Sequence, residues 1–472
     1  MRVQEDSDTS GPPLDFHEPY GGYHRRDIPP EDAELTHVGP GTPCGEYMRK
    51  FWQPICLSQQ LTDVPLAIRI LGEDLVAFRD RSDRLGVLHR HCSHRGTSLE
   101  YGIVSERGIR CCYHGWLFDI DGTILETPGE PPGSRLKDSL CHGAYAAFEH
   151  NGLVFAYMGT PEEKPDFPMF EEYDPPSTKV LAFSNYLPCN WLQAYENGID
   201  ILHNAIFHNG VGNAALQRGE GKSAFSFNGA FEEIPVTEWR LADDGSGAGN
   251  GSGMISISTR RLGDKVWVRM NHCTEPNYIH SGTFWENAKE VSYHKRLALT
   301  RWMVPIDDTH TWALGWRYFN DRVDPEHLGN EDEVGVDKVD HLAGQTWRPY
   351  EEGQRDPGDY EVMVNQRPIA VHALEHLGWT DTGVAMLRQI IRRGVRGETP
   401  RGLPTPAGSR TDICFRSYTS DTVLLVPKQE DHDDRELLRG IGDRVAAVVF
   451  AGHAYTGVER DEFVKRRLAE IG

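Results

Sequence analysis

Two closely spaced pairs of a cysteine and a histidine constrain this sequence more than any other feature. Cys92 and His94 form the first pair, with one residue between them, and Cys111 and His114 form the second, with two. Each pair is short enough to come from one loop, and glycines that suit tight loops follow both pairs. We therefore expect two loop tips, each of which offers one sulfur and one nitrogen.

Two thiolates and two imidazoles are the ligand set of a Rieske [2Fe–2S] cluster. The thiolates hold one iron and the imidazoles hold the other, which makes the cluster less negative and raises its reduction potential above that of all-cysteine ferredoxins. The sequence thus predicts Cys92, His94, Cys111 and His114 as cluster ligands. Zinc also accepts two cysteines and two histidines, but zinc motifs usually separate paired ligands by two to five residues. The remaining alternative is purely structural, with two buried thiols and two surface histidines.

Cys112 stands next to Cys111 and competes with it as a ligand. Cys111 leaves two residues before His114, so we assign Cys111 to the cluster. Cys112 is then a small residue that fills space.

A second group of candidate metal ligands lies downstream, at Asp200, His203 and His208. On an α-helix, Asp200 and His203 share a face. His203 and His208 are about 140° apart around an ideal helix, so both reach one metal only where the helix ends or bulges. Two histidines and a carboxylate form the facial triad of non-haem Fe(II) oxygenases, which leaves positions open for dioxygen. A core helix with satisfied histidines is the alternative, but the upstream cluster favours iron, because a cluster domain alone only carries electrons.

The composition excludes several classes of partner and location. The formal net charge of −22 argues against a nucleic acid or an anionic membrane as partner. The N-terminus lacks the pattern of a secretory signal, and no stretch approaches 18 consecutive apolar residues. We expect a cytoplasmic protein whose nine cysteines are thiols or metal ligands.

The chain of 472 residues has room for two or three domains. Short apolar runs broken by turn residues predict β-structure from about 61 to 160. Prolines and acidic residues around 160–180 predict a linker, and residues 371–393 show helical periodicity. The predicted divisions are an N-terminal arm at 1–35, a cluster domain at 36–165, a second metal-binding domain at 181–425 and a C-terminal helical extension at 426–472.

From residue 36 to about 393, the sequence resembles the alpha (oxygenase) subunits of Rieske aromatic ring-hydroxylating systems, in the phthalate dioxygenase-like branch. CSHRG and CCYHGWLFDIDG resemble the cluster loops, although Cys112 stands where proline is usual, and NWLQAYENGIDILHNAIFH resembles the iron helix. PGDYEVMVNQRPIAVHALEHLGWTDTGVAML resembles the segment that supplies a carboxylate ligand. The resemblance implies Asp359 as this ligand, although Gly358 stands where glutamine is common; spacing alone does not separate Asp359 from Asp356.

The resemblance also implies the fold class and the assembly. We expect an α+β chain in which an all-β Rieske [2Fe–2S] domain precedes a helix-grip (START-like) α+β catalytic domain. Three subunits would form a head-to-tail ring, in which an electron passes from one subunit's cluster to the next subunit's iron. Asp200 would then bridge His203 and the partner subunit's His114, and Asn197 would support the site. An ordinary helix-surface acid is the alternative for Asp200.

The predicted function is that of the terminal oxygenase component of a multicomponent Rieske system. It would use O₂ and a mononuclear Fe(II) to hydroxylate or O-demethylate an aromatic, carboxylated compound. The glycine-rich segments 39–45 and 243–253 lack the strand–turn–helix setting of a nucleotide site, so a separate NAD(P)H-dependent reductase is implied. Alternatives are a Rieske electron-transfer protein and a zinc-stapled binding module. Four arginines are candidates to clamp a substrate carboxylate: Arg240, Arg260, Arg261 and Arg269.

Overall fold

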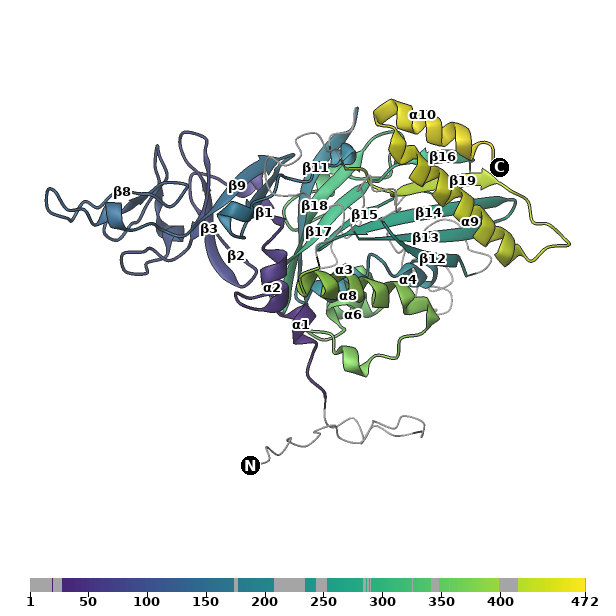
Figure 1. The fold of residues 1–472 in the computed structure, drawn as a ribbon, viewed down its shortest axis with the longest axis horizontal. Coiled ribbons are helices and arrows are strands. Elements are labelled where there is room, and N and C mark those ends of the chain that lie inside the picture. The colour runs from purple at the N-terminus through teal and green to yellow at the C-terminus, as the bar shows by residue number, and fades with distance from the viewer. Residues whose placement is uncertain are drawn as a thin grey trace.

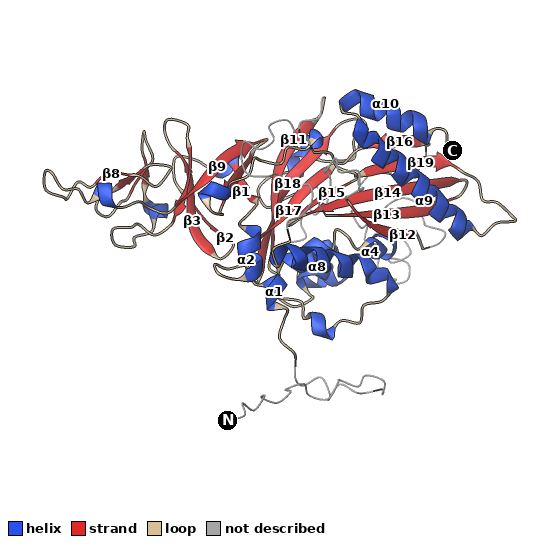
Figure 2. Ribbon diagram, in the orientation of Figure 1, coloured by secondary structure: helices blue, strands red, loops and turns tan. Residues whose placement is uncertain are grey.

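Two sheet-based units follow one another along the chain in the computed structural model (Figure 1, Figure 2). The structure describes residue 19 and residues 28–173, 177–207, 234–242, 253–282, 286, 288, 290–324, 326–340, 348–355, 357–398 and 415–471. Within these ranges, no helix is long and apolar enough to cross a membrane. The all-β unit comes first and the α+β unit second, so the predicted fold class is confirmed.

The first unit consists of two antiparallel sheets. The larger sheet has the order β1-β10-β9-β4-β3-β2, and the smaller has the order β5-β6-β7-β8. Leu71 and Gly72, both with positive φ, make the tight turn between β2 and β3. The strands are β1 (Trp52–Leu57), β2 (Leu66–Ile70), β3 (Glu73–Arg79), β4 (Leu85–His89), β5 (Ile103–Val104), β6 (Ile109–Arg110), β7 (Leu117–Phe118), β8 (Ile124–Glu126), β9 (Ala144–His150) and β10 (Leu153–Tyr157).

The second unit contains one large antiparallel sheet. Its order is β11-β18-β17-β15-β14-β13-β12, and β19 pairs with both β14 and β16. The strands are β11 (Lys179–Leu187), β12 (Val236–Leu241), β13 (Met254–Leu262), β14 (Lys265–Thr274), β15 (Tyr278–Ser281), β16 (Ser292–Lys295), β17 (Leu299–Asp307), β18 (His310–Phe319) and β19 (Ser420–Leu425).

Two C-terminal helices, α9 (Asp434–Ala451) and α10 (Gly457–Leu468), cover one face of this sheet (Figure 1). α9 buries Leu438, Ile441, Val445 and Val449 at the spacing of an amphipathic helix, against a core that includes Ile257 of β13. Burial of each such side chain stabilises the fold by roughly 1.5–3 kcal/mol.

The other face of the sheet packs against short helices from the middle of the chain. Neighbouring strand residues point to opposite faces, so the face opposite Ile257 carries Ser256 and its cross-strand partner Trp239. The Trp239 indole donates to the carbonyl of Ile199, and its ring lies close to Gly383. These helices are α3 (Trp191–Glu196), α4 (Ile201–Ile206), α6 (Tyr350–Arg355), α7 (Asp359–Val364) and α8 (Thr382–Val395).

The described end of the predicted N-terminal arm is anchored on α8. Asp32 and Glu34 form ion pairs with Arg392, and Glu34 also accepts from the Arg396 Nε at 2.7 Å. Both acids flank or lie in the short helix α1 (Ala33–Thr36). A second short helix, α2 (Pro43–Met48), then leads into β1.

A buried ion pair connects the end of α2 to the β2–β3 turn and β3. Arg49 is 6% exposed, and its Nη2 donates to Glu73 at 2.9 Å and to the Leu71 carbonyl at 2.9 Å. Tyr145 donates to the other Glu73 oxygen at 2.6 Å, and His89 lies 3.4 Å from it. Burial opposes ionisation of Glu73, but the hydrogen bonds from His89, Tyr145 and Arg49 outweigh it and lower its pKa to about 2.

We expect Glu73→Gln to lower the stability at pH 7 by roughly 2 kcal/mol or more, because it leaves the Arg49 charge buried without its partner. The folded pKa lies below the unfolded value, so this stabilisation is present above about pH 4.5 and fades as the pH falls toward 2. Urea unfolding of both proteins, followed by tryptophan fluorescence from pH 7 down to about pH 3, measures the difference in the free energy of unfolding. A difference in unfolding free energy that grows as the pH falls would contradict the assignment of Glu73 as the ionised partner of Arg49.

Candidate functional site

The two predicted cluster loops have the same backbone form. In the first, the Gly96 N–H donates to the Cys92 carbonyl at 2.8 Å, and in the second Gly115 donates to Cys111 at 3.1 Å. Both glycines have a φ of 74°, which side-chain-bearing residues rarely adopt. Each loop therefore closes tightly just after its histidine.

The loops bring the four predicted cluster ligands together. Cys92 and Cys111 are buried side by side; burial, with the Cys111 thiol adding to it, raises the pKa of Cys92 to about 11. The rings of His94 and His114 lie 4.5 Å apart, and His94 stacks on Trp116 at 4.8 Å. The two sulfurs thus lie on the inner side and the two imidazoles nearer the surface, as a bridged pair of irons requires.

The same arrangement fits a cluster better than a zinc ion. A structural zinc gathers four ligands around one point, but in the described part of the chain no three His, Cys, Asp or Glu side chains converge on a single ion. Two bridged irons need only two protein ligands each. Cys112 is exposed, whereas Cys111 is buried beside Cys92, which favours Cys111 as the ligand.

The segment that resembles the iron helix is split into two helices. α3 ends at Glu196 and α4 begins at Ile201, where Asp200 caps the helix by accepting from the backbone N–H of His203. Gly198 lies in the break, where a Cβ would come within 2.3 Å of the Ile279 side chain. The break falls before Asp200, where Gly198 approaches Ile279 of β15. Asp200 and His203 therefore lie together at the start of α4, as their spacing predicts.

His203 lies between two carboxylates. Its Nδ1 is 3.5 Å from Asp200 and its Nε2 is 3.7 Å from Asp359. The Asn197 amide nitrogen is also 3.5 Å from the His203 Nε2. Burial opposes protonation of His203, but Asp200 and Asp359 outweigh it and raise its pKa. One nitrogen is thus oriented by Asp200, and the other is available to a metal shared with Asp359.

The structure describes only part of the predicted iron site. Asp359 begins α7 and is 7% exposed, so two distant segments meet at His203. His208 and Asp356 lie outside the described residues. The side chains that are described fit an Fe(II) facial triad, since an imidazole and a carboxylate face each other across a gap that one ion can fill.

The four arginines considered for substrate binding contact other parts of the protein. Arg240 pairs with Glu238 and Asp443, Arg261 with Asp434, Arg269 with Asp421, and Arg260 lies over the Trp267 ring at 4.6 Å. These contacts give each of them a structural role.

Sequence reasoning missed Arg301 of β17. Its side chain is buried, and its charge acts on both His203 and Asp359. The available signal was a single basic residue inside the otherwise apolar strand LTRWMVP, which indicates a charge that points into the protein.

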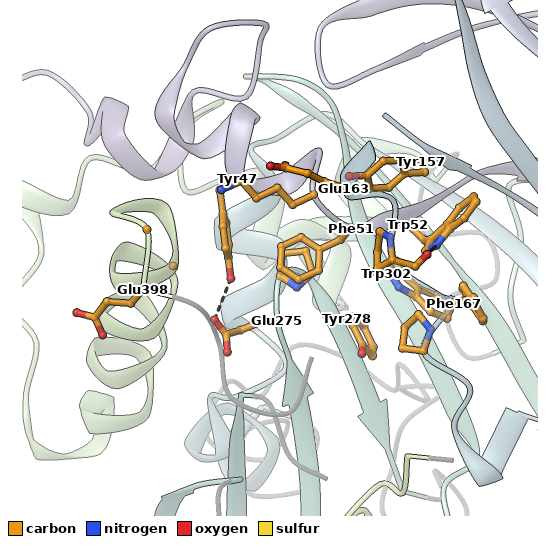
Figure 3. A pocket seen from close by; sticks show the side chains of 16 residues that line it. Tyr47, Phe51, Trp52, Tyr157, Glu163, Phe167, Glu275, Tyr278, Trp302 and Glu398 are labelled. Carbon is orange, nitrogen blue, oxygen red and sulfur yellow. Dashed lines mark hydrogen bonds between the residues drawn. The ribbon is translucent and has the colours of Figure 1, made fainter. Parts of the chain in front are cut away.

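A separate cavity of about 320 Å³ lies where the two domains meet (Figure 3). None of the predicted site residues lines it. The Tyr47 hydroxyl donates to Glu275 at 2.9 Å on one of its sides. Its walls are mainly aromatic, from Tyr47, Phe51, Trp52, Tyr157, Phe167, Tyr278 and Trp302. We therefore assign this cavity to the domain junction rather than to the iron site.

Comparison with known proteins places the chain in a family. A family model described as the Rieske [2Fe-2S] domain matches residues 51–146. A tert-butanol monooxygenase / tert-amyl alcohol desaturase oxygenase subunit from Aquincola tertiaricarbonis is 49% identical, over 96% of each chain. The phenoxybenzoate dioxygenase subunit alpha of Ectopseudomonas oleovorans is 34% identical, over 79% of this chain and 87% of the relative.

A solved structure supports the fold. The crystal structure of dicamba monooxygenase bound to dicamba matches with a TM-score of 0.51 and 18% identity, over 74% of this chain and 97% of that chain. At this identity the match concerns the fold alone. The sequence relatives show that the chain belongs to the Rieske ring-hydroxylating oxygenases, in the phthalate dioxygenase-like branch. It is an O₂-incorporating oxygenase (alpha) subunit, the terminal oxygenase of a multicomponent system.

Proposed function

We propose that this enzyme oxygenates a small branched alcohol of the tert-butanol type. The observation that carries this proposal is the 49% identity, over 96% of both chains, with a protein named for tert-butanol monooxygenation and tert-amyl alcohol desaturation. A relative that similar along its whole length supports a common substrate class, although fold alone does not specify function.

The proposed metal sites are those predicted from the sequence. We propose Cys92, His94, Cys111 and His114 as cluster ligands, and His203, His208 and Asp359 as ligands of a mononuclear Fe(II). The bound Fe(II) would supply O₂ activation and the oxidising power that attacks an unactivated C–H bond. Electrons would come from a separate NAD(P)H-dependent reductase.

Asp200 is proposed to connect the two metal sites. Its side chain is 35% exposed while it also lies 3.5 Å from the His203 Nδ1, so a group from another chain can reach it. In a head-to-tail trimer that group would be the partner subunit's His114. Burial opposes ionisation of Asp200, but hydrogen bonds from His203 and two backbone N–H groups lower its pKa, so the carboxylate is ready to accept. Asn197, next to the His203 Nε2, is proposed to support the site.

We expect Asp200→Asn to slow reoxidation of the reduced cluster by about 10–100-fold, the usual effect of losing a supporting carboxylate. Asparagine also caps helices well, so α4 should remain intact. The visible absorbance of the cluster in a single turnover gives the rate of its reoxidation, and metal analysis checks that both iron sites remain filled. An unchanged rate in a fully loaded variant would remove Asp200 from the electron path.

A second candidate substrate class is an aromatic carboxylate. The 34% identical relative is named for phenoxybenzoate. The buried Arg301, whose charge acts on Asp359, offers a positive charge for a carboxylate.

The deciding experiment is oxygen uptake with a supplied reductase, followed by mass spectrometry of products made under ¹⁸O₂. The panel contains tert-butanol, tert-amyl alcohol, 3-phenoxybenzoate and phthalate. Labelled or desaturated product from the alcohols alone supports the proposal. Product from the aromatic acids alone would replace it with the second candidate. Cluster reduction without labelled or desaturated product from any of the four compounds would contradict both proposed substrate classes.

A further inference from the structure

Arg301 carries a positive charge into the interior next to the proposed iron site. The residue is 7% exposed, and its Nε is buried without a hydrogen-bond partner. Among the described residues, its guanidinium takes part in no hydrogen bond or ion pair. A buried charge without hydrogen bonds is costly, since it loses water and gains no replacement. Such a group is retained where it serves a purpose other than stability.

Arg317, on the adjacent strand, shows how this fold treats a structural arginine. It is fully buried, and it donates to Asp340 at 3.1 Å and to the carbonyls of Ala298 and Tyr318 at 3.1 and 2.8 Å. Arg301 and Arg317 are thus both buried, but within the described residues only Arg317 has hydrogen-bond partners for its guanidinium. The contrast indicates that the described part of the chain supplies no partner for Arg301, which leaves its guanidinium available to a ligand.

The position of Arg301 restricts where that partner binds. Arg301 pairs across the sheet with Ile279 on one side and Gly315 on the other. Cross-strand partners share a face, and the Ile279 side chain packs against Gly198, between α3 and α4. Arg301 is therefore on the sheet face that α3 and α4 cover, and its charge acts on His203 and Asp359.

We propose that Arg301 is a specificity-determining residue that binds an oxygen atom of the substrate. This inference rests on the function proposed for the same site. The shared chemistry is an oxygen with lone pairs, which accepts a hydrogen bond from the guanidinium. A tertiary alcohol and a carboxylate both provide it, and a hydrocarbon does not. The contact determines which end of the substrate is held, and hence which carbons are presented for oxygenation.

Three ligands that share one branched carbon skeleton and differ in a single substituent test the proposal. tert-Amyl alcohol carries a hydroxyl, 2,2-dimethylbutanoate carries a carboxylate at the same position, and 2,2-dimethylbutane carries a methyl group there. In Arg301→Leu, we expect the dissociation constant of whichever oxygen-bearing ligand the wild type binds to rise about tenfold or more, from loss of a charge-assisted hydrogen bond. Binding of the hydrocarbon should be unchanged. Calorimetry on the intact enzyme, without turnover, provides the affinities.

The melting temperature separates a substrate-binding role from a structural one. Arg301→Leu should keep or raise it, because the variant removes a buried charge that makes no hydrogen bond in the described part of the chain. The matched control, Arg317→Leu, should lower it, because Asp340 loses its partner. Arg301→Lys keeps the charge, so it should bind the oxygen-bearing ligand with an affinity between those of the wild type and Arg301→Leu. It also serves as the test variant if Arg301→Leu does not fold.

Two results would overturn the inference. One is equal affinity of Arg301→Leu and wild type for both oxygen-bearing ligands. The other is a fall in melting temperature as large as that of Arg317→Leu. A different result rejects only the proposed function: the wild type binds the carboxylate but not the alcohol, and Arg301 still controls that binding.

Discussion

Replacing Cys111 with alanine should remove the [2Fe–2S] cluster and lower the iron content from about three to about one per chain. Cys111 is buried beside Cys92, at the inner side of the two facing loops. A cluster iron that loses one of its two thiolates keeps a single protein ligand. In the described loops, no other buried cysteine lies where it could replace the lost thiolate. Electron delivery should stop, and oxygenation with it.

Cys112→Ala is the matched control, because it removes the adjacent, exposed thiol. It should keep the labile sulfide, the colour and the Rieske EPR signal of the wild type. Iron and sulfide analysis of both variants, with EPR of the dithionite-reduced proteins, makes the comparison. If Cys112→Ala loses the cluster and Cys111→Ala keeps it, the two roles must be exchanged. Bound zinc without sulfide in the wild type would end the cluster assignment altogether.

The cluster site could be predicted from the sequence because its geometry is local. Each loop carries its own cysteine and histidine, and the glycine after each pair permits the positive φ that closes the loop. What spacing could not supply is the burial difference between Cys111 and Cys112, which depends on packing in the domain. The structure adds that the two cysteines are adjacent inside and the two imidazoles are adjacent outside.

The second site was less predictable because its residues come from separate elements. No spacing rule connects His203 to Asp359; that pairing came from family resemblance, and the structure places the two side chains 3.7 Å apart. The break between α3 and α4 was missed because Gly198 responds to the close approach of Ile279, a tertiary contact. Helical periodicity over 371–393 also overestimated a helix: α8 begins only at Thr382.

The substrate could not be predicted from the motifs, because the motifs hold metals and not the substrate. Family resemblance suggested an aromatic carboxylate, while the 49% identical relative is named for small tertiary alcohols. By our proposal, Arg301 is one of the side chains that choose between these substrates. A single arginine in a strand has no periodic or spacing signature, so its importance appears only once its burial and its neighbours are known.

His203→Ala should abolish oxygenation and lower the iron content from about three to about two per chain, while the Rieske EPR signal remains. The imidazole lies between Asp200 and Asp359, so its loss removes a proposed iron ligand and also the group that Asp200 orients. Loss of a supporting residue costs about 10–100-fold in metal affinity, and loss of a direct ligand should cost more. Added Fe(II) should therefore not restore activity at ordinary concentrations.

His310→Ala is a suitable control, because His310 is a partly exposed histidine at the start of β18 that pairs with Asp307 at the end of β17. It should keep all three irons and full activity. The pair of variants tests whether the third iron binds at His203, since only the loss of that histidine should remove it. Two irons in the wild type, unchanged by His203→Ala, would leave the second domain without a metal role. Three irons in His203→Ala would move the mononuclear site to other residues, because the Asp200–His203–Asp359 arrangement could then not be what holds it.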